Sequence, residues 1–179
     1  MKNKQIGIFL DRDGVLNQAY GFRPPNNPSE LRLLPGAAAA VRDLNQADFK
    51  VFVVTNQGGV GLGYMTPDDL HAIHAKLLEE IHKVGGRIDE IMACIHKPKE
   101  GCSCRKPQPG MLTTLAAKHN IDLSKSFMVG DREIDIKAGA AAGTKTILIT
   151  DETKVETQAD HICDSLTTAA QLILKLTSL

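Results

Sequence analysis

Two aspartates directly follow the first apolar segment of the chain, and this arrangement constrains the fold more than any other feature. Residues 6–10 are typical of a buried strand, and Asp11-Arg12-Asp13-Gly14 comes immediately after them. Residues two apart in an extended segment point to the same side, so Asp11 and Asp13 can face one site. Gly14 permits a turn that a side chain would hinder. A solvated acidic turn explains these four residues equally well, so partners elsewhere in the chain must decide.

Segments typical of strands alternate with segments typical of helices along the chain. The expected strands occupy residues 6–10, 51–54, 88–95, 126–129 and 145–150, and residues 160–163 are a candidate edge strand. The expected helices occupy about residues 36–46, 67–84, 110–119, 134–142 and 166–176. This alternation predicts an α/β fold, a Rossmann-like three-layer sandwich in which right-handed crossovers build a central parallel sheet.

Size and charge limit the classes of partner. The chain has 179 residues, which favours one domain spanning residues 1–179. The formal net charge is zero, which argues against a dedicated nucleic-acid binder and a basic membrane-surface protein. No apolar stretch approaches the ~20 residues of a membrane span, and the N-terminal residues do not resemble a signal peptide. We therefore expect a monomeric, cytoplasmic protein with reduced thiols and a small-molecule substrate.

Polar side chains follow three of the expected strands at the point where each strand ends. Asp11 and Asp13 follow the first strand, Thr55 the second and Asp131 the fourth, while Lys106 lies in a loop. Ligands bind beyond the carboxyl ends of parallel strands, so we expect these side chains to gather at one edge. Close carboxylates repel each other without a cation, and they favour a hard cation such as Mg²⁺. A hydroxyl, a lysine and backbone N–H groups can hold a phosphoryl group, so the set predicts phosphoryl transfer.

A second group of residues has the spacing of metal ligands. Cys94 and His96 are two residues apart, and so are Cys102 and Cys104. Three thiolates and one imidazole complete a tetrahedral Zn²⁺ site with no open position, which favours a structural zinc. A redox pair and unrelated free thiols are the alternatives. Cys163 is distant in sequence and is expected to be a small buried residue.

Three other features are expected to be structural. The segment 15–35, rich in Pro and Asn, is expected to form an ordered surface loop that could overhang the site. The glycine-rich segment 58–63 is expected to be a flexible loop. His71, His74 and His82 are expected on the solvated surface of a helix rather than at a metal.

Four of these features, in this order, resemble the motifs of the haloacid dehalogenase superfamily. They are Asp11-Arg12-Asp13-Gly14, Val54-Thr55-Asn56, Lys106, and Gly130-Asp131 with Asp135. The resemblance implies that Asp11 is the nucleophile that forms an aspartyl-phosphate and that Asp13 is the general acid and base. Thr55 would bind phosphate, and Lys106 would neutralise phosphate and orient Asp11. Mg²⁺ would be held by Asp131, Asp11 and the carbonyl of Asp13, with Asp135 supporting the metal's waters.

The zinc-loop stretch, residues 94–111, resembles two groups within that superfamily. These are the D,D-heptose 1,7-bisphosphate 7-phosphatases and the histidinol-phosphate phosphatases, which lack a large cap and carry a zinc loop. Residues 11–17 and Thr55-Asn56-Gln57 resemble the heptose group. The five-residue spacer between His96 and Cys102 resembles the histidinol-phosphate group more, and Leu62 stands where heptose-type sequences often carry Arg.

The resemblance implies a Mg²⁺-dependent phosphatase, with a heptose bisphosphate as the first substrate and histidinol phosphate as the alternative. Candidate substrate contacts are Thr55, Asn56, Gln57, Arg105 and Arg23. A catalytically inactive phosphate-binding or zinc-stabilised interaction protein is a second class, and the intact Asp11 and Asp13 argue against it. A phosphomutase needs a cap that shields the phospho-enzyme, and the segments between the motifs are too short for a large one.

Overall fold

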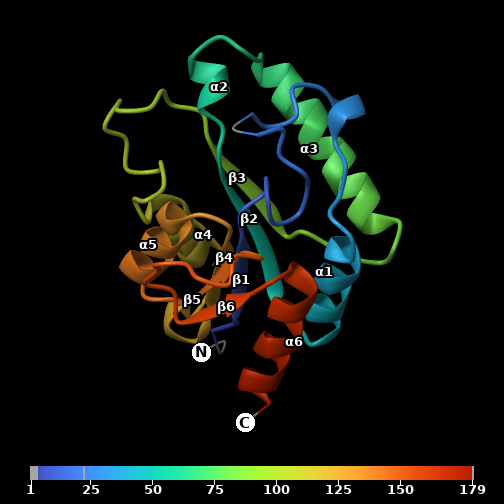
Figure 1. Ribbon diagram of the computed structural model, residues 1–179, viewed down its shortest axis with the longest axis vertical. Coiled ribbons are helices and arrows are strands. Elements are labelled where there is room, and N and C mark those ends of the chain that lie inside the picture. Colours follow the sequence, from blue (N-terminus) through green and yellow to red (C-terminus); the bar gives the residue numbers. More distant parts are fainter. Residues whose placement is uncertain (1–3, 22, 179) are drawn as a thin grey trace.

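A six-stranded parallel sheet forms the centre of the computed structural model, which describes residues 4–21 and 23–178. The strand order is β3-β2-β1-β4-β5-β6, and Figure 1 labels these strands. The strands are β1 (Gly7–Leu10), β2 (Lys50–Asn56), β3 (Glu90–Cys94), β4 (Phe127–Gly130), β5 (Lys145–Ile149) and β6 (His161–Cys163). Each neighbouring pair is parallel, which confirms the predicted α/β fold.

Helices cover both faces of the sheet (Figure 1). They are α1 (Ala37–Gln46), α2 (Gly58–Gly61), α3 (Pro67–His82), α4 (Gly110–His119), α5 (Glu133–Ala142) and α6 (Leu166–Thr177), with 3₁₀ turns at Pro28–Glu30 and Leu123–Lys125. The long elements begin and end within two residues of the predicted bounds. No helix in the described ranges is long and apolar enough to cross a membrane.

Alternating side chains of β1 build two separate cores. Ile8 and Leu10 pack in one core, to which α1, α3 and α6 contribute. Phe9 points to the opposite face and packs with Leu112 of α4 and Ala138 of α5. This alternation is the two-residue period of a strand that is buried on both faces. The predicted three-layer sandwich is therefore confirmed.

The segments that leave the carboxyl ends of the strands gather at one end of the molecule (Figure 1). The described part of the 15–35 loop is ordered, as predicted, by isolated bridges such as Asn17 with Leu33. The expectation of a flexible loop at 58–63 is wrong at its start, because residues 58–61 form the helical turn α2. A Cβ on Gly61 would lie 2.6 Å from the carbonyl oxygen of Ile95, so glycine lets this turn pack closely against the chain after β3.

Candidate active site

Lys106 joins the ends of β1 and β2 to α5. Its ammonium nitrogen Nζ lies 2.8 Å from Oδ1 of Asp11, 2.8 Å from the carbonyl oxygen of Val54 and 2.6 Å from Oδ1 of Asp135. Burial alone would lower the pKa of Lys106, but the two carboxylates outweigh burial and raise it. The lysine is therefore a fixed cation at the carboxyl edge of the sheet, as its position in the sequence suggested.

Three carboxylates converge beside Lys106. One oxygen each of Asp11, Asp131 and Asp135 lies within 4.8 Å of the others. Burial is the largest cause that raises the pKa of Asp11 to about 7, and the neighbouring carboxylates add to it. Burial followed by the charge of Asp135 raises the pKa of Asp131 to about 6. The cluster thus carries negative charge that one lysine compensates only in part.

This donor set fits a hard divalent cation. Oδ1 of Asp131 is buried without a hydrogen-bond partner among the described residues, and such an atom is costly unless something binds it. Gly14 has a φ of +87°, and a Cβ there would collide with the Asp131 carboxylate. Glycine at the end of the acidic turn therefore allows Asp131 to approach Asp11. The residues predicted to hold Mg²⁺ by their side chains are brought together.

Asp13 faces the same cavity and is held by several donors. It lines a cavity of about 310 Å³ together with Asp11, Thr55 and Lys106. Its Oδ1 accepts a hydrogen bond from Nδ2 of Asn17 at 2.9 Å. The side chain of Arg12 contacts both of its carboxylate oxygens. The two aspartates of the turn therefore share one site, which excludes the alternative of a merely solvated acidic turn.

The three polar residues that follow Val54 have different surroundings. Thr55 lines the small cavity, as a phosphate ligand would. The side-chain amide of Asn56 makes two bonds to the backbone of Lys106, donating to its carbonyl oxygen and accepting from its N–H, each at 3.0 Å. Gln57 is buried, and its Nε2 donates to Oδ2 of Asp13 and Oγ1 of Thr55. Asn56 and Gln57 therefore make these bonds within the protein, although both also border the larger cavity.

A larger cavity of about 940 Å³ extends outward from the small one, and both are bordered by Asn56 and Lys106. Arg105 lines it and donates to the carbonyl oxygen of His96 at 3.3 Å. Arg23 also lines it but pairs with Glu30 at 2.7 Å. The cavity is wide enough for a substrate much larger than inorganic phosphate.

Sequence reasoning missed one arginine of this cavity. Arg132 borders both cavities, and within the described ranges its side chain makes no ion pair or hydrogen bond. Its backbone N–H donates to Oδ2 of Asp135 at 3.1 Å, which also fixes that carboxylate. The signal that could have found it is its place directly after Asp131, at the carboxyl end of β4.

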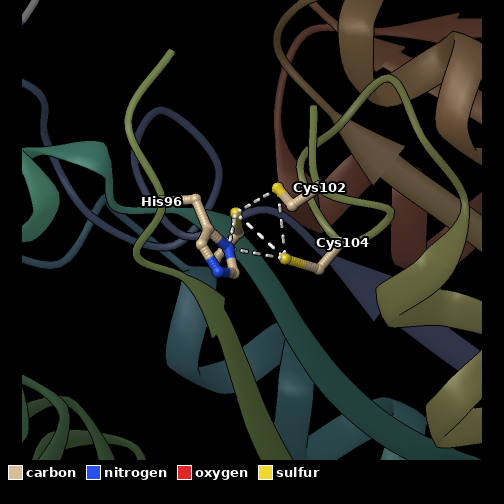
Figure 2. A group of neighbouring side chains, drawn as sticks. His96, Cys102 and Cys104 are labelled. Carbon is tan, nitrogen blue, oxygen red and sulfur yellow. Dashed lines mark hydrogen bonds between the residues drawn. The ribbon is translucent and has the colours of Figure 1, made fainter. Parts of the chain in front are cut away.

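The predicted zinc ligands lie together beside this cleft. Nδ1 of His96 is 3.2 Å from Sγ of Cys104, and Sγ of Cys104 is 3.2 Å from that of Cys94 and 3.5 Å from that of Cys102. Figure 2 shows His96, Cys102 and Cys104 pointing toward one another. All four donor atoms lie within 4.8 Å of one another, near the roughly 3.7 Å sulfur separations of a tetrahedron with Zn–S bonds of about 2.3 Å.

The electrostatics of the four ligands also favour a cation. Burial and then the neighbouring thiols of Cys94 and Cys102 raise the pKa of Cys104 to about 12. Burial acts against ionisation of Cys102 too, but hydrogen bonds from Cys104 and the backbone of Arg105 lower its pKa to about 7. One thiolate therefore forms readily and opposes ionisation of Cys104, and a bound dication removes that penalty. Cys163, half-buried against the core beside α6, takes no part in the cluster.

Comparison with known proteins identifies the family. A family model described as HAD-hydrolase-like matches residues 103–169. The D-glycero-beta-D-manno-heptose-1,7-bisphosphate 7-phosphatase of Rhodopseudomonas palustris is 42% identical over 147 residues, which cover 78% of this chain and 81% of that protein. The Bordetella bronchiseptica protein of the same name is 37% identical over 94% of this chain and 97% of its own length.

The chain belongs to this family of HAD-like phosphatases. The crystal structure of the D,D-heptose 1,7-bisphosphate phosphatase from B. bronchiseptica, complexed with magnesium and phosphate, agrees with this. It superposes with a TM-score of 0.87 at 36% identity, covering 96% of this chain and 99% of the other. Family membership confirms the predicted superfamily and the prediction that the chain is a phosphatase. The family model spans Lys106, Asp131 and Asp135.

Proposed function

We propose that this phosphatase removes the 7-phosphate of D-glycero-β-D-manno-heptose 1,7-bisphosphate in a Mg²⁺-dependent reaction. The observation that carries the proposal is the geometry around Asp11. Its carboxylate lies 2.8 Å from the Lys106 ammonium and close to two further carboxylates, in a chain that shares 37% identity with a relative of that name. A site with this charge arrangement can hold a cation and a phosphoryl group together.

The proposed reaction has two steps. An oxygen of Asp11 attacks phosphorus, the bond between phosphorus and the sugar oxygen breaks, and Asp13 gives its proton to the departing oxygen. Asp13 then takes a proton from a water molecule, whose oxygen attacks the phosphorus and releases phosphate from Asp11. Lys106 and Thr55 hold the oxygens of the phosphoryl group throughout. When bound to Asp11, Asp131 and the Asp13 carbonyl, Mg²⁺ supplies positive charge that stabilises the transferring phosphoryl group.

The wide cavity supports a substrate with a second anionic group. Arg105 borders the wide cavity and Arg132 borders both cavities, and a guanidinium suits phosphate. Histidinol phosphate instead carries an amine, which these two arginines would repel. This contrast favours the bisphosphate. Arg23 is a weaker candidate for a substrate contact, because Glu30 already holds its guanidinium.

We infer that the cluster of Cys94, His96, Cys102 and Cys104 binds a structural zinc ion. All four protein ligands are supplied, so no coordination position remains for a reacting group. Arg105 and Lys106 follow the last ligand directly, and Asn56 clamps the backbone of Lys106. The zinc would thus hold the loop that carries the catalytic lysine.

Phosphate release by the purified protein with Mg²⁺ tests the proposal. We expect kcat/KM for the heptose bisphosphate to exceed that for histidinol phosphate by at least about 100-fold, since a hydrogen bond between charged groups contributes about 1.5–3 kcal/mol. The ³¹P NMR spectrum of the product should show the 1-phosphate retained through its coupling to the anomeric hydrogen. A preference for histidinol phosphate of similar size would refute the substrate while leaving the reaction class intact. The Asp11→Asn variant is the matched control and should be inactive on both.

A further inference from the structure

Arg12 is completely buried, although it stands between the two aspartates of the site. Its exposed fraction is 0%, which is rare for a guanidinium unless it is paired. It borders neither of the two cavities described above, so it does not contact the substrate region. The reaction proposed above gives it no role. Its burial therefore calls for an explanation through its partner, Asp13.

Arg12 donates two parallel hydrogen bonds to the carboxylate of Asp13. Its Nε donates to Oδ1 at 3.2 Å and its Nη2 donates to Oδ2 at 3.1 Å. Two parallel bonds fix the plane of a carboxylate, because rotation about the Cβ–Cγ bond would break both. The side chain of Arg12 makes no other hydrogen bond in the described part of the chain.

The other two donors to Asp13 are neutral amides, and each also donates to a second acceptor. Nδ2 of Asn17 also donates to the carbonyl oxygen of Gln18, and Nε2 of Gln57 also donates to Oγ1 of Thr55. When either amide releases its carboxylate oxygen, its other N–H stays bonded, so the loss is that of one bond from a neutral donor. A carboxylate must free one lone pair to accept or give a proton, since four donors occupy all four of its positions. The amides can yield, whereas Arg12 holds the orientation.

One nitrogen of the Arg12 guanidinium and one ring nitrogen of His74 on α3 are buried polar atoms that Asp13 does not satisfy. Nη1 of Arg12 and Nε2 of His74 are both buried, and neither has a hydrogen-bond partner among the described residues. Burial, followed by the charge of Arg12, lowers the pKa of His74 to about 4. The ring is therefore neutral near pH 7, and its Nε2 can accept a hydrogen bond from the guanidinium through one bridging water. His74 is thus not the solvated surface histidine expected from the sequence.

We propose that Arg12 is the positioning residue for Asp13 and that His74 of α3 seats the Arg12 guanidinium. The proposal rests on the acid–base role given to Asp13 above. Arg12 keeps the carboxylate turned toward the departing oxygen, so no rotation has to be frozen when the proton is transferred. The structure thereby connects the acid–base residue to α3, an element on the outside of the sheet.

A leaving-group comparison distinguishes positioning from a merely structural role. Phenyl phosphate and 4-nitrophenyl phosphate have nearly the same shape, but only phenol needs a proton to depart readily. Both lack the sugar, so lost sugar contacts cannot imitate the effect. The measured quantity is kcat/KM with Mg²⁺, because it reports the step in which the first product leaves.

Arg12→Met should lower kcat/KM for phenyl phosphate by about tenfold or more, a part of the 10²–10⁴-fold that general acid catalysis provides. It should change kcat/KM for 4-nitrophenyl phosphate by no more than about twofold. Asp13→Asn should show the same pattern more strongly. Arg12→Lys keeps the charge but loses the two parallel donors, so its loss on phenyl phosphate should lie between those of the wild type and Arg12→Met. His74→Leu should repeat the pattern in weaker form, while His71→Leu, an exposed residue one turn away on α3, should match the wild type.

Equal losses on both substrates in folded Arg12 variants, or no loss on either, would overturn the proposal. If Arg12→Met does not unfold cooperatively, it is not properly folded and its kinetics are set aside. Arg12→Lys and His74→Leu then decide, through the loss in kcat/KM for phenyl phosphate relative to the loss for 4-nitrophenyl phosphate. The underlying function fails in a different way: the wild type would then hydrolyse neither ester, or Asp11→Asn would remain active. A wild type that is active and depends on Asp11, with Arg12 and His74 variants that show no leaving-group selectivity, refutes the positioning role alone.

Discussion

The ammonium nitrogen of Lys106 lies 2.8 Å from Oδ1 of Asp11, although 95 residues separate the two in sequence. Both side chains are nearly inaccessible to solvent. A buried ion pair of this kind seldom adds much stability, because desolvation offsets most of the attraction. Its presence therefore favours a role in holding charge for the reaction.

Lys106→Met should abolish most of the activity. We expect kcat to fall by about 10²–10³-fold, the usual effect of removing one donor that stabilises the transition state. The variant also leaves Asp11 and Asp135 without their cation, so its free energy of unfolding without metal should drop by about 3–5 kcal/mol. Steady-state kinetics and urea unfolding measure the two effects. Lys137→Met, at an exposed position of α5, is the control and should change neither.

Asn56→Ala should impair catalysis through Lys106 rather than through sugar binding. The variant removes both hydrogen bonds to the backbone of Lys106, so the lysine should lose its fixed position. We expect kcat/KM to fall about tenfold, equally for the heptose bisphosphate and for 4-nitrophenyl phosphate, since the loss corresponds to about 1.4 kcal/mol. A loss confined to the sugar substrate would contradict the positioning of Lys106 by Asn56, and it would show instead that Asn56 contacts the substrate.

Protein purified without added metal should contain about one zinc ion per chain, as the four-ligand site requires. Cys104→Ser should lower both the zinc content and the melting temperature, and it should reduce kcat because the following loop carries Lys106. Elemental analysis, thermal unfolding and kinetics measure these effects. Cys163→Ser is the matched control and should keep the zinc. Metal-free wild-type protein with all of its thiols titratable would refute the site.

The stabilisation that Mg²⁺ provides should grow as the pH rises from 5 to 8. Folding raises the pKa of Asp11 to about 7 and that of Asp131 to about 6, so without metal the folded state binds more protons than the unfolded state in this range. The free energy of unfolding of the metal-free protein therefore falls with increasing pH. For each of the two groups the fall is about 1.4 kcal/mol for every pH unit between its unfolded and folded pKa values.

Mg²⁺ binds the ionised carboxylates and should remove this loss. Folding lowers the pKa of His74 to about 4, so below pH 6.5 this residue makes the free energy of unfolding rise with pH. That contribution is the same with and without metal. The difference between thermal unfolding with and without Mg²⁺ is therefore the quantity to follow. A difference that is the same at pH 5.5 and pH 7.5 would contradict the metal site. In Asp131→Asn, Mg²⁺ should raise the unfolding temperature less than in the wild type at both pH 5.5 and pH 7.5.

The sheet and the charged centre of the site could be predicted because simple periodicities determine them. Apolar runs bounded by turn residues define the strands, and parallel strands carry their carboxyl ends to one edge. Asp11, Thr55 and Asp131 each follow such a strand, so their meeting required no knowledge of side-chain packing. The roles given to these residues, the single domain, the monomeric state and the cytoplasmic location stay predictions.

The partners of the amide side chains could not be predicted. Asn56 and Gln57 can both donate and accept, so the sequence cannot tell a bond to substrate from a bond to Lys106 or Asp13. Arg12 is different, because strand alternation already turns it away from the side that Asp11 and Asp13 share. Its burial was therefore accessible to sequence reasoning, whereas its pairing with Asp13 depends on a turn that only the structure shows.

Direct detection of the phospho-enzyme tests the central claim, that Asp11 is the nucleophile. The Asp13→Asn variant should form the intermediate from 4-nitrophenyl phosphate and release it slowly, because the water that attacks it lacks its base. Acid quenching during turnover, reduction with borohydride and peptide mass spectrometry should then find homoserine at residue 11, only with Mg²⁺ and substrate present. Turnover without any modification at Asp11, or with the modification at another residue, would contradict the account.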